Sequence, residues 1–367
     1  MLVKDFLLNL PGTINCEKTV FIQSDDWGSI RVPSNAILKK LSMTSKFDCN
    51  DPYAVYDTLA DSEDLECLLN VLSKVKNDHG KNPVFEPNFI VSNPDFNLIR
   101  KGNFKRYYQE SLRDTFARYS NLKAMNLWHE GIRDGIFIPQ FHGREHVNIS
   151  FWLEMLQKNA PGVRSAFDSQ VFGLNFYRLP KNQKNFQRAW DVSLCEHTNE
   201  INDAIIEGIK IFQSLFGYAP VSMIAPNYTW NKEQEDLAFK HGIKIVQGIL
   251  RQRVPNTNVG DYAYKYRFTS SGKHNQAIYL RRNVFFEPTL NRGKFDQKSA
   301  LRKIEASFLA RKPAVISTHR LNFIGSRSLN NRANNIILFE SFLNAIVKKW
   351  PDVSFMSSKD FVNERNK

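Results

Sequence analysis

The stretch Thr19-Val20-Phe21-Ile22-Gln23-Ser24-Asp25-Asp26-Trp27-Gly28 places two adjacent carboxylates directly after an apolar run of β-strand character. Like charges in a shared site push one pKa upward, so two ionised aspartates need a cation nearby. A divalent metal would meet this need, because one aspartate could ligate the ion while the other acts as a base toward a metal-bound water. The alternative is a solvated turn, in which aspartate is common because of its local hydrogen bonds.

Short β-rich runs alternate with longer amphipathic segments along the chain, a pattern typical of parallel βα units. We expect strands over residues 19–24, 84–91, 135–141, 221–225, 243–249, 277–286 and 314–318, with a candidate eighth over 353–356. Helices are expected over residues 62–76, 202–216, 232–241 and 331–350. No repeat or linker divides the chain, so residues 1–367 are predicted to form one domain with long loop insertions at about 29–83 and 251–274.

Composition narrows the classes of protein that fit this chain. The 367 residues are 42% hydrophobic and 24% charged, which suits a large globular core. The formal net charge of +13 raises nucleic acid as a partner, but lysine and arginine are spread along the chain without a nucleic-acid motif, which favours a solvated basic surface. Since there is no long apolar stretch, no signal-peptide pattern and no CxxC pair among the four cysteines, we expect a cytoplasmic protein without a membrane partner.

A second reactive group, His142-Gly143-Arg144-Glu145-His146, follows the strand expected at 135–141. Histidines four residues apart lie on one face of a helical turn, so both imidazoles could bind one ion. The same residues also match His-x-x-Glu-His, a zinc metallopeptidase pattern in which Glu145 would be the base. That pattern must lie within a helix, whereas Gly143 and the preceding strand place it at a helix start.

The third candidate for chemistry is a single residue, His319, which directly follows the apolar run Val315-Ile316-Ser317-Thr318. One histidine after one strand is more often a hydrogen-bonded residue of the rim than a catalytic group. In parallel α/β folds, however, functional groups gather at the carboxyl ends of strands, and here three strands end in Asp-Asp, His and His. Their convergence favours one shared site over three unrelated turns.

In this order the three groups resemble motifs of the polysaccharide deacetylase family, also called the NodB-homology or carbohydrate esterase 4 group. The family's first motif, Thr-Phe-Asp-Asp-Gly, is similar to residues 23–28, its second, His-Ser/Thr-x-x-His, to residues 142–146, and its fifth to residues 317–319. The resemblance extends over residues 19–356 by motif order. It implies an α/β fold of a specific kind, a distorted (β/α)7 barrel with elaborated rim loops.

The resemblance also implies a metal-dependent hydrolase that removes an acyl group, with N-acetyl as the first choice, from a sugar or glycan. Asp25 would be the base and His319 the general acid. Asp26, His142 and His146 would hold a divalent ion, with zinc as the default for this ligand set.

The family's Arg-x-Pro-Tyr motif has only a partial counterpart in residues 224–228, because its arginine, which holds the base, is missing. Either Arg144, Arg281 or Arg282 replaces that arginine from elsewhere in the chain, or the base is tuned differently in this protein. A backbone N–H near Asn227 or Tyr228 would stabilise the oxyanion of the reaction. Five residues close to the proposed site in the sequence are candidates for substrate binding, namely Trp27, Asn227, Tyr228, Trp230 and Arg144.

Two other functions stay open beside the deacetylase. One is the zinc metallopeptidase that uses Glu145, although this reading gives Asp25 and Asp26 no role. The other is a non-catalytic carbohydrate-binding barrel, suggested by the missing arginine and by Gly143 where the family has serine or threonine.

Overall fold

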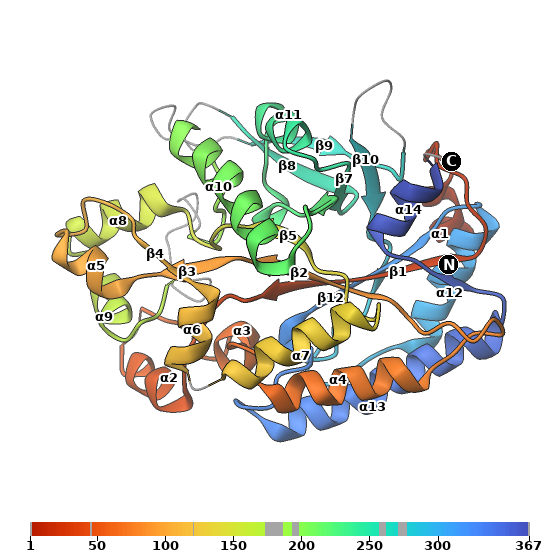
Figure 1. The fold of residues 1–367 in the computed structure, drawn as a ribbon, viewed down its shortest axis with the longest axis horizontal. Helices are drawn as coiled ribbons and strands as arrows, with labels where there is room; N and C mark the ends of the chain where they lie inside the picture. Colours follow the sequence, from red (N-terminus) through yellow and green to blue (C-terminus); the bar gives the residue numbers. More distant parts are fainter. Residues whose placement is uncertain are drawn as a thin grey trace.

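A curled, parallel β-sheet forms the centre of the protein, whose computed structural model describes residues 2–44, 46–119, 121–172, 186–192, 198–256, 262–270 and 277–365 (Figure 1). Along the sheet the strands follow the order β10-β7-β6-β5-β2-β1-β12-β11, and β13 also pairs with β1. Every pairing in this sheet is parallel. The strands are β1 (Thr19–Trp27), β2 (Phe85–Ile90), β5 (Gln140–Gly143), β6 (Ser222–Met223), β7 (Ile245–Gly248), β10 (Ile278–Arg281), β11 (Val284–Phe285), β12 (Ala314–His319) and β13 (Ser354–Phe355).

The first and last strands in this order, β10 and β11, are two halves of one bent segment, residues 278–285. Its first half, β10, pairs with β7, and its second half, β11, pairs with β12. The change of partner occurs within two consecutive residues, because the Arg282 N–H donates to the Gly248 carbonyl at 2.7 Å and the Asn283 N–H donates to the Val315 carbonyl at 3.1 Å. The sheet therefore curls into a distorted (β/α)7 barrel, as the sequence predicts.

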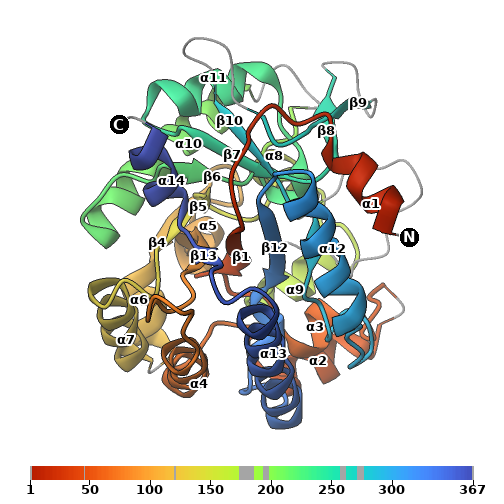
Figure 2. The ribbon, with the colours of Figure 1, turned by 90° about the vertical axis from the view of Figure 1, so that its right-hand side faces the viewer.

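Helices surround the sheet on its outer side (Figure 2). The Asp61 side chain accepts a hydrogen bond from the Asp64 N–H and so caps α4, whose start at Ser62 is the predicted one. The four predicted helices are confirmed to within a few residues as α4, α10, α11 and α13. The helices are α1 (Leu2–Asn9), α2 (Asn35–Ser42), α3 (Pro52–Tyr56), α4 (Ser62–Lys74), α5 (Phe96–Lys101), α6 (Leu112–Arg118), α7 (Leu122–Arg133), α8 (Ile149–Gln157), α9 (Val163–Asp168), α10 (Thr198–Phe216), α11 (Lys232–Lys240), α12 (Gln297–Leu309), α13 (Leu329–Lys349) and α14 (Ser358–Arg365).

The two expected long loops contain secondary structure of their own. Residues 29–83 contain helices α2, α3 and α4. Residues 251–274 contain an antiparallel hairpin of β8 (Arg251–Pro255) and β9 (Tyr262–Tyr266), and a second small hairpin, β3 (Ser92–Pro94) with β4 (Gln109–Ser111), follows β2. Parts of the second loop, residues 257–261 and 271–274, lie outside the described residues, as does Cys195.

The barrel interior changes from apolar to polar along its axis. Phe21, Ile245, Leu280 and Val315 come from four different strands and form one buried cluster. Two residues further along β1, and therefore on the same face of the strand, Gln23 begins a buried polar network. This polar layer separates the apolar base of the barrel from the rim where the strands end.

Glu86 on β2 is the buried acid at the lower edge of the polar layer. It accepts hydrogen bonds from the Ser358 N–H at 2.6 Å, the Ser358 hydroxyl at 3.0 Å and the Gln23 amide at 3.3 Å. Burial nevertheless outweighs these bonds and raises the pKa of Glu86 from its ordinary 4.5 to about 7. The folded protein therefore favours the protonated carboxyl.

A Glu86→Gln variant is expected to keep stability that the native protein loses as the pH rises. A raised acid pKa stabilises the fold below pH 4.5, and this contribution disappears as the pH passes through about 7. Between pH 4.5 and 8 the native protein should lose about 3 kcal/mol of unfolding free energy relative to Glu86→Gln. Urea unfolding across this range measures the difference, with Glu364→Gln on the exposed surface of α14 as the control. Parallel curves for all three proteins would contradict the raised pKa.

The helices over the described part of the chain lack the combination of length and hydrophobicity that a bilayer crossing requires.

Candidate active site

Asp25 and Asp26 lie in a β-bulge at the carboxyl end of β1. Ser24 pairs with Pro87 and Trp27 with Phe89, so β1 contains one residue more than β2 over this interval. Neighbouring side chains of a regular strand point to opposite faces, but the bulge and the positive φ of 75° at Asp26 break this alternation. Both aspartates consequently line the same pocket.

His142 lies in a second bulge, on β5, which is separated from β1 by β2 in the sheet. Phe141 pairs with Phe89 and Gly143 with Ile90, which leaves His142 as the extra residue of β5. Gly143 has a φ of 125°, where an added Cβ would also lie 3.3 Å from the Glu145 carbonyl oxygen. This backbone geometry explains glycine at the position.

The two histidines do not share a helical turn. His142 belongs to β5, and His146 lies in the loop that precedes α8, so the prediction of a helical spacing is wrong. The loop nevertheless folds back and brings the two ring centroids to 5.1 Å.

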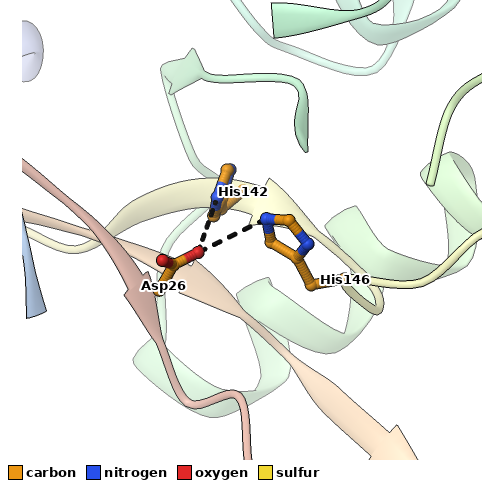
Figure 3. Close-up of side chains that lie close together, drawn as sticks. All are labelled: Asp26, His142 and His146. Atoms are coloured by element: carbon orange, nitrogen blue, oxygen red, sulfur yellow. Dashed lines mark ion pairs between the residues drawn. The ribbon is translucent and has the colours of Figure 1, made fainter. Parts of the chain in front are cut away.

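One carboxylate oxygen and two imidazole nitrogens meet in a buried group (Figure 3). The Oδ1 atom of Asp26 lies 3.5 Å from Nε2 of His142 and 3.3 Å from Nε2 of His146. A tetrahedral zinc site with ligand bonds of about 2.0–2.1 Å has edges of about 3.3 Å between its ligands. Both distances from Asp26 therefore fit a shared divalent ion.

The hydrogen bonding of His142 and the burial of His146 also suit a metal. Nδ1 of His142 donates to the Ile224 carbonyl at 2.9 Å, an outer hydrogen bond of the kind that orients metal-binding imidazoles, while Nε2 lies on the side of Asp26. Burial lowers the pKa of His146 to about 3, so its imidazole is neutral at physiological pH. Because a buried carboxylate oxygen and two imidazoles lie this close together, a cation between them would stabilise the arrangement.

Arg31 forms an ion pair with the second carboxylate oxygen of Asp26. Its Nη2 atom lies 2.8 Å from Asp26 Oδ2, and its Nε lies 3.0 Å from Asp57. Burial opposes the charge of Asp26, but Arg31 outweighs it and holds the pKa of this carboxyl well below its usual range. Arg31 thus keeps Asp26 ionised while Oδ1 faces the histidines. Sequence reasoning did not identify Arg31, because only the fold shows its partner.

Arg282 holds Asp25. Its two terminal nitrogens contact the carboxylate at 2.6 and 2.7 Å, and the Asn88 amide donates a third hydrogen bond at 2.8 Å. Burial disfavours ionised Asp25, but the bidentate pair with Arg282 prevails and lowers the pKa of Asp25 to about 2. Of the three arginines considered from the sequence, only Arg282 contacts Asp25; Arg281 instead bonds to Asn9.

His319 lies beside Asp25 and is oriented by Glu287. Its Nε2 is 3.9 Å from Asp25 Oδ2, while its Nδ1 is 2.6 Å from Glu287 Oε1. The Asn322 amide in turn donates to Glu287 at 2.8 Å. Burial opposes the charged imidazolium, but Glu287 overcomes this effect and raises the pKa of His319 to about 9. From the sequence, Glu287 is a candidate for the rim only, without an assigned chemical role, because its one signal is its place directly after the strand expected at 277–286.

All five residues predicted for chemistry line one pocket of about 360 Å³. Asn227 and Tyr228 line it as well, at positive φ values of 54° and 53°. The Tyr228 N–H donates to the Ala225 carbonyl at 3.0 Å and is therefore not available to a substrate.

Three of the predicted substrate-binding residues lie away from this pocket. Trp27 is fully buried and packs edge-on against Trp128 with 5.0 Å between ring centroids, so its ring cannot stack on a sugar. Trp230 is also buried and donates to Glu235. Arg144 forms ion pairs with Glu145 and Glu207 instead. None of these three side chains lines the pocket that contains Asp25 and Asp26, so the structure does not bring them to the proposed site.

Glu145 does not line the pocket that contains the two histidines, as the peptidase pattern would require. Its carboxylate accepts from Arg144 at 2.5 Å, and residues 142–146 lie before the start of α8. The structure therefore provides neither the helix nor the base of that motif.

No family model matches the chain, and no curated protein matches it either. Solved structures similar to it include a 4-alpha-glucanotransferase from Thermococcus litoralis, with 10% identity, a TM-score of 0.44, 95% of this chain covered and 40% of the other. PuuE allantoinase is 8% identical with a TM-score of 0.40, and the match covers 95% of this chain and 90% of the allantoinase. A polysaccharide deacetylase from Bacillus cereus is 9% identical with a TM-score of 0.30, and the match covers 73% of this chain and 64% of the deacetylase. These similarities assign the chain to no family.

Proposed function

We propose that this protein is a metal-dependent hydrolase that removes an acyl group, N-acetyl in the first instance, from a sugar or glycan. The observation that carries the proposal is the arrangement of the pocket. A buried Asp26-His142-His146 group lies beside a carboxylate and a histidine whose protonation states are set by separate partners, Arg282 and Glu287. Pairs of titratable groups with opposite pKa shifts are typical of acid and base assignments.

Asp26, His142 and His146 would hold the ion, and zinc is the default choice for these donors. When bound, a divalent ion polarises an acyl carbonyl and lowers the pKa of water toward about 7. Asp25 is ionised and would accept the proton of the attacking water. The backbone N–H of Asn227 would stabilise the developing oxyanion, an interaction worth about 3 kcal/mol per donor. His319 would donate its proton to the leaving amine.

Acetate release from N-acetylated mono- and oligosaccharides by the zinc-loaded protein tests this proposal. A Glu145→Gln variant should release acetate within about threefold of the native rate, because Glu145 bonds to Arg144 rather than to the site. Loss of acetate release in Glu145→Gln, together with cleavage of peptides by the native protein, would favour the metallopeptidase. Sugar binding without acetate release would favour the non-catalytic barrel.

A Glu287→Gln variant is expected to lose hydrolase activity at a lower pH than the native protein does as the pH is raised. Without the carboxylate beside Nδ1, the pKa of His319 should fall, so the protonated acid disappears at a lower pH. The basic limb of the pH profile of kcat should move about 1 pH unit or more toward acid. A Glu287→Asp variant retains a carboxylate and should recover part of the high-pH activity. An unchanged limb would mean that Glu287 does not act through His319.

A further inference from the structure

We propose that the substrate of this site carries an anionic group, a carboxylate or a phosphate, which Arg251 and Arg253 bind at the mouth of the pocket. This inference rests on the proposed hydrolase function and narrows its substrate class to acidic or phosphorylated acylated sugars.

The β8–β9 hairpin directs two arginines toward the pocket. Arg251 and Arg253 are two residues apart on β8, so their side chains lie on one face, and their partners across the hairpin are Tyr266 and Tyr264. The opposite face is fixed to the barrel, since the buried Gln252 amide donates to the Trp230 carbonyl at 2.8 Å. Arg251, Arg253 and Tyr264 line the same pocket as the proposed metal ligands.

Among the described residues that line this pocket, the positive charges exceed the negative ones. Its two carboxylates are already paired, Asp25 with Arg282 and Asp26 with Arg31. Within the described residues, neither Arg251 nor Arg253 lies within 4.0 Å of a carboxylate oxygen. Two guanidinium groups are therefore left to attract an anion, and a bound divalent ion would add further positive charge.

The contacts of the two arginines also indicate a role in binding. The Arg251 guanidinium lies 3.6 Å from the centroid of the Tyr264 ring, which holds it in place without neutralising it. Nε of Arg253 is buried and has no hydrogen-bond partner among the described residues, a costly state for a guanidinium nitrogen. An arginine fork matches carboxylate and phosphate oxygens, which accept two parallel hydrogen bonds.

Tyr264 would complete this subsite. It is 46% exposed and lines the pocket, so one part of its ring is available to a sugar while the other packs against Arg251. The anionic group would then contact the hairpin while the acyl group reaches the base of the pocket.

Binding measurements can test the inference independently of turnover. Calorimetry would compare N-acetylglucosamine with N-acetylglucosamine 1-phosphate and with 2-acetamido-2-deoxyglucuronic acid. We expect at least one of the anionic sugars to bind the native protein about 10- to 100-fold more tightly than the neutral sugar. A carboxylate preference and a phosphate preference each support the proposal and identify the source of the charge.

The Arg251→Met/Arg253→Met double variant should bind all three sugars with nearly equal affinity. Arg113→Met, on the exposed side of α6, is the matched control and should retain the preference. Equal binding of neutral and anionic sugars by the native protein would overturn the inference. So would a preference that persists in the double variant, because the metal site and not the hairpin would then bind the anion. An Arg-dependent preference without acetate release would instead contradict the proposed hydrolase and leave the anion subsite standing.

Discussion

An Asp26→Ala variant is expected to bind zinc at least about 100-fold more weakly than the native protein and to lose its hydrolase activity. Asp26 supplies the only carboxylate of the buried Asp26-His142-His146 group. Loss of a residue that merely orients a metal ligand already costs about 10- to 100-fold in affinity, so loss of a ligand should cost no less. Equilibrium dialysis against zinc and an acetate-release assay on the same preparation measure the two effects.

The fold should survive this substitution. Arg31 loses one anionic partner in Asp26→Ala but keeps its ion pair with Asp57 at 3.0 Å. Asp203→Ala, which removes an exposed carboxylate on α10, is the matched control and should leave zinc binding and activity unchanged. Native zinc affinity or native acetate release in a folded Asp26→Ala protein would rule out the proposed metal site.

The barrel and the position of its site follow from features that are local in the sequence. Apolar runs mark the strands, and in a parallel sheet all their carboxyl ends lie on one rim. Because β1 pairs with both β2 and β12, and β2 pairs with β5, residues that follow these strands are necessarily near one another. This is why the sequence alone is enough to group Asp25, His142 and His319.

The partners of these residues could not be predicted in the same way. Arg282 is 257 residues from Asp25 in the sequence, and its selection over Arg281 depends on the change of strand partner at residues 282 and 283. The two bulges are equally invisible in the sequence, since a shift of one residue in register leaves no compositional trace. Proximity along the chain was also misleading: Trp27 adjoins Asp26 but packs into the core.

An Arg282→Met variant is expected to lose about 3–5 kcal/mol of unfolding free energy at neutral pH. The Arg282 side chain is fully buried and forms both bonds to Asp25, so its loss leaves a buried carboxylate without a counter-charge. The pKa of Asp25 should rise as a result, which would also remove the ionised base. Urea unfolding measures the stability, and Arg281→Met, which loses a hydrogen bond to Asn9, should cost only about 1 kcal/mol.

The Asp25→Asn/Arg282→Met double variant separates charge pairing from packing. Asp25→Asn alone leaves Arg282 buried without an anion, whereas the double variant removes both charges at once and should recover most of the lost stability. Activity should not recover, because Asp25→Asn lacks the base and should lower kcat by about 10²- to 10⁴-fold in either background. The native protein, the two single variants and the double variant form a double-mutant cycle. If the losses of unfolding free energy in the two single variants simply add in the double variant, Arg282 stabilises the barrel through its bonds to Gln23 and Gln247 rather than through Asp25.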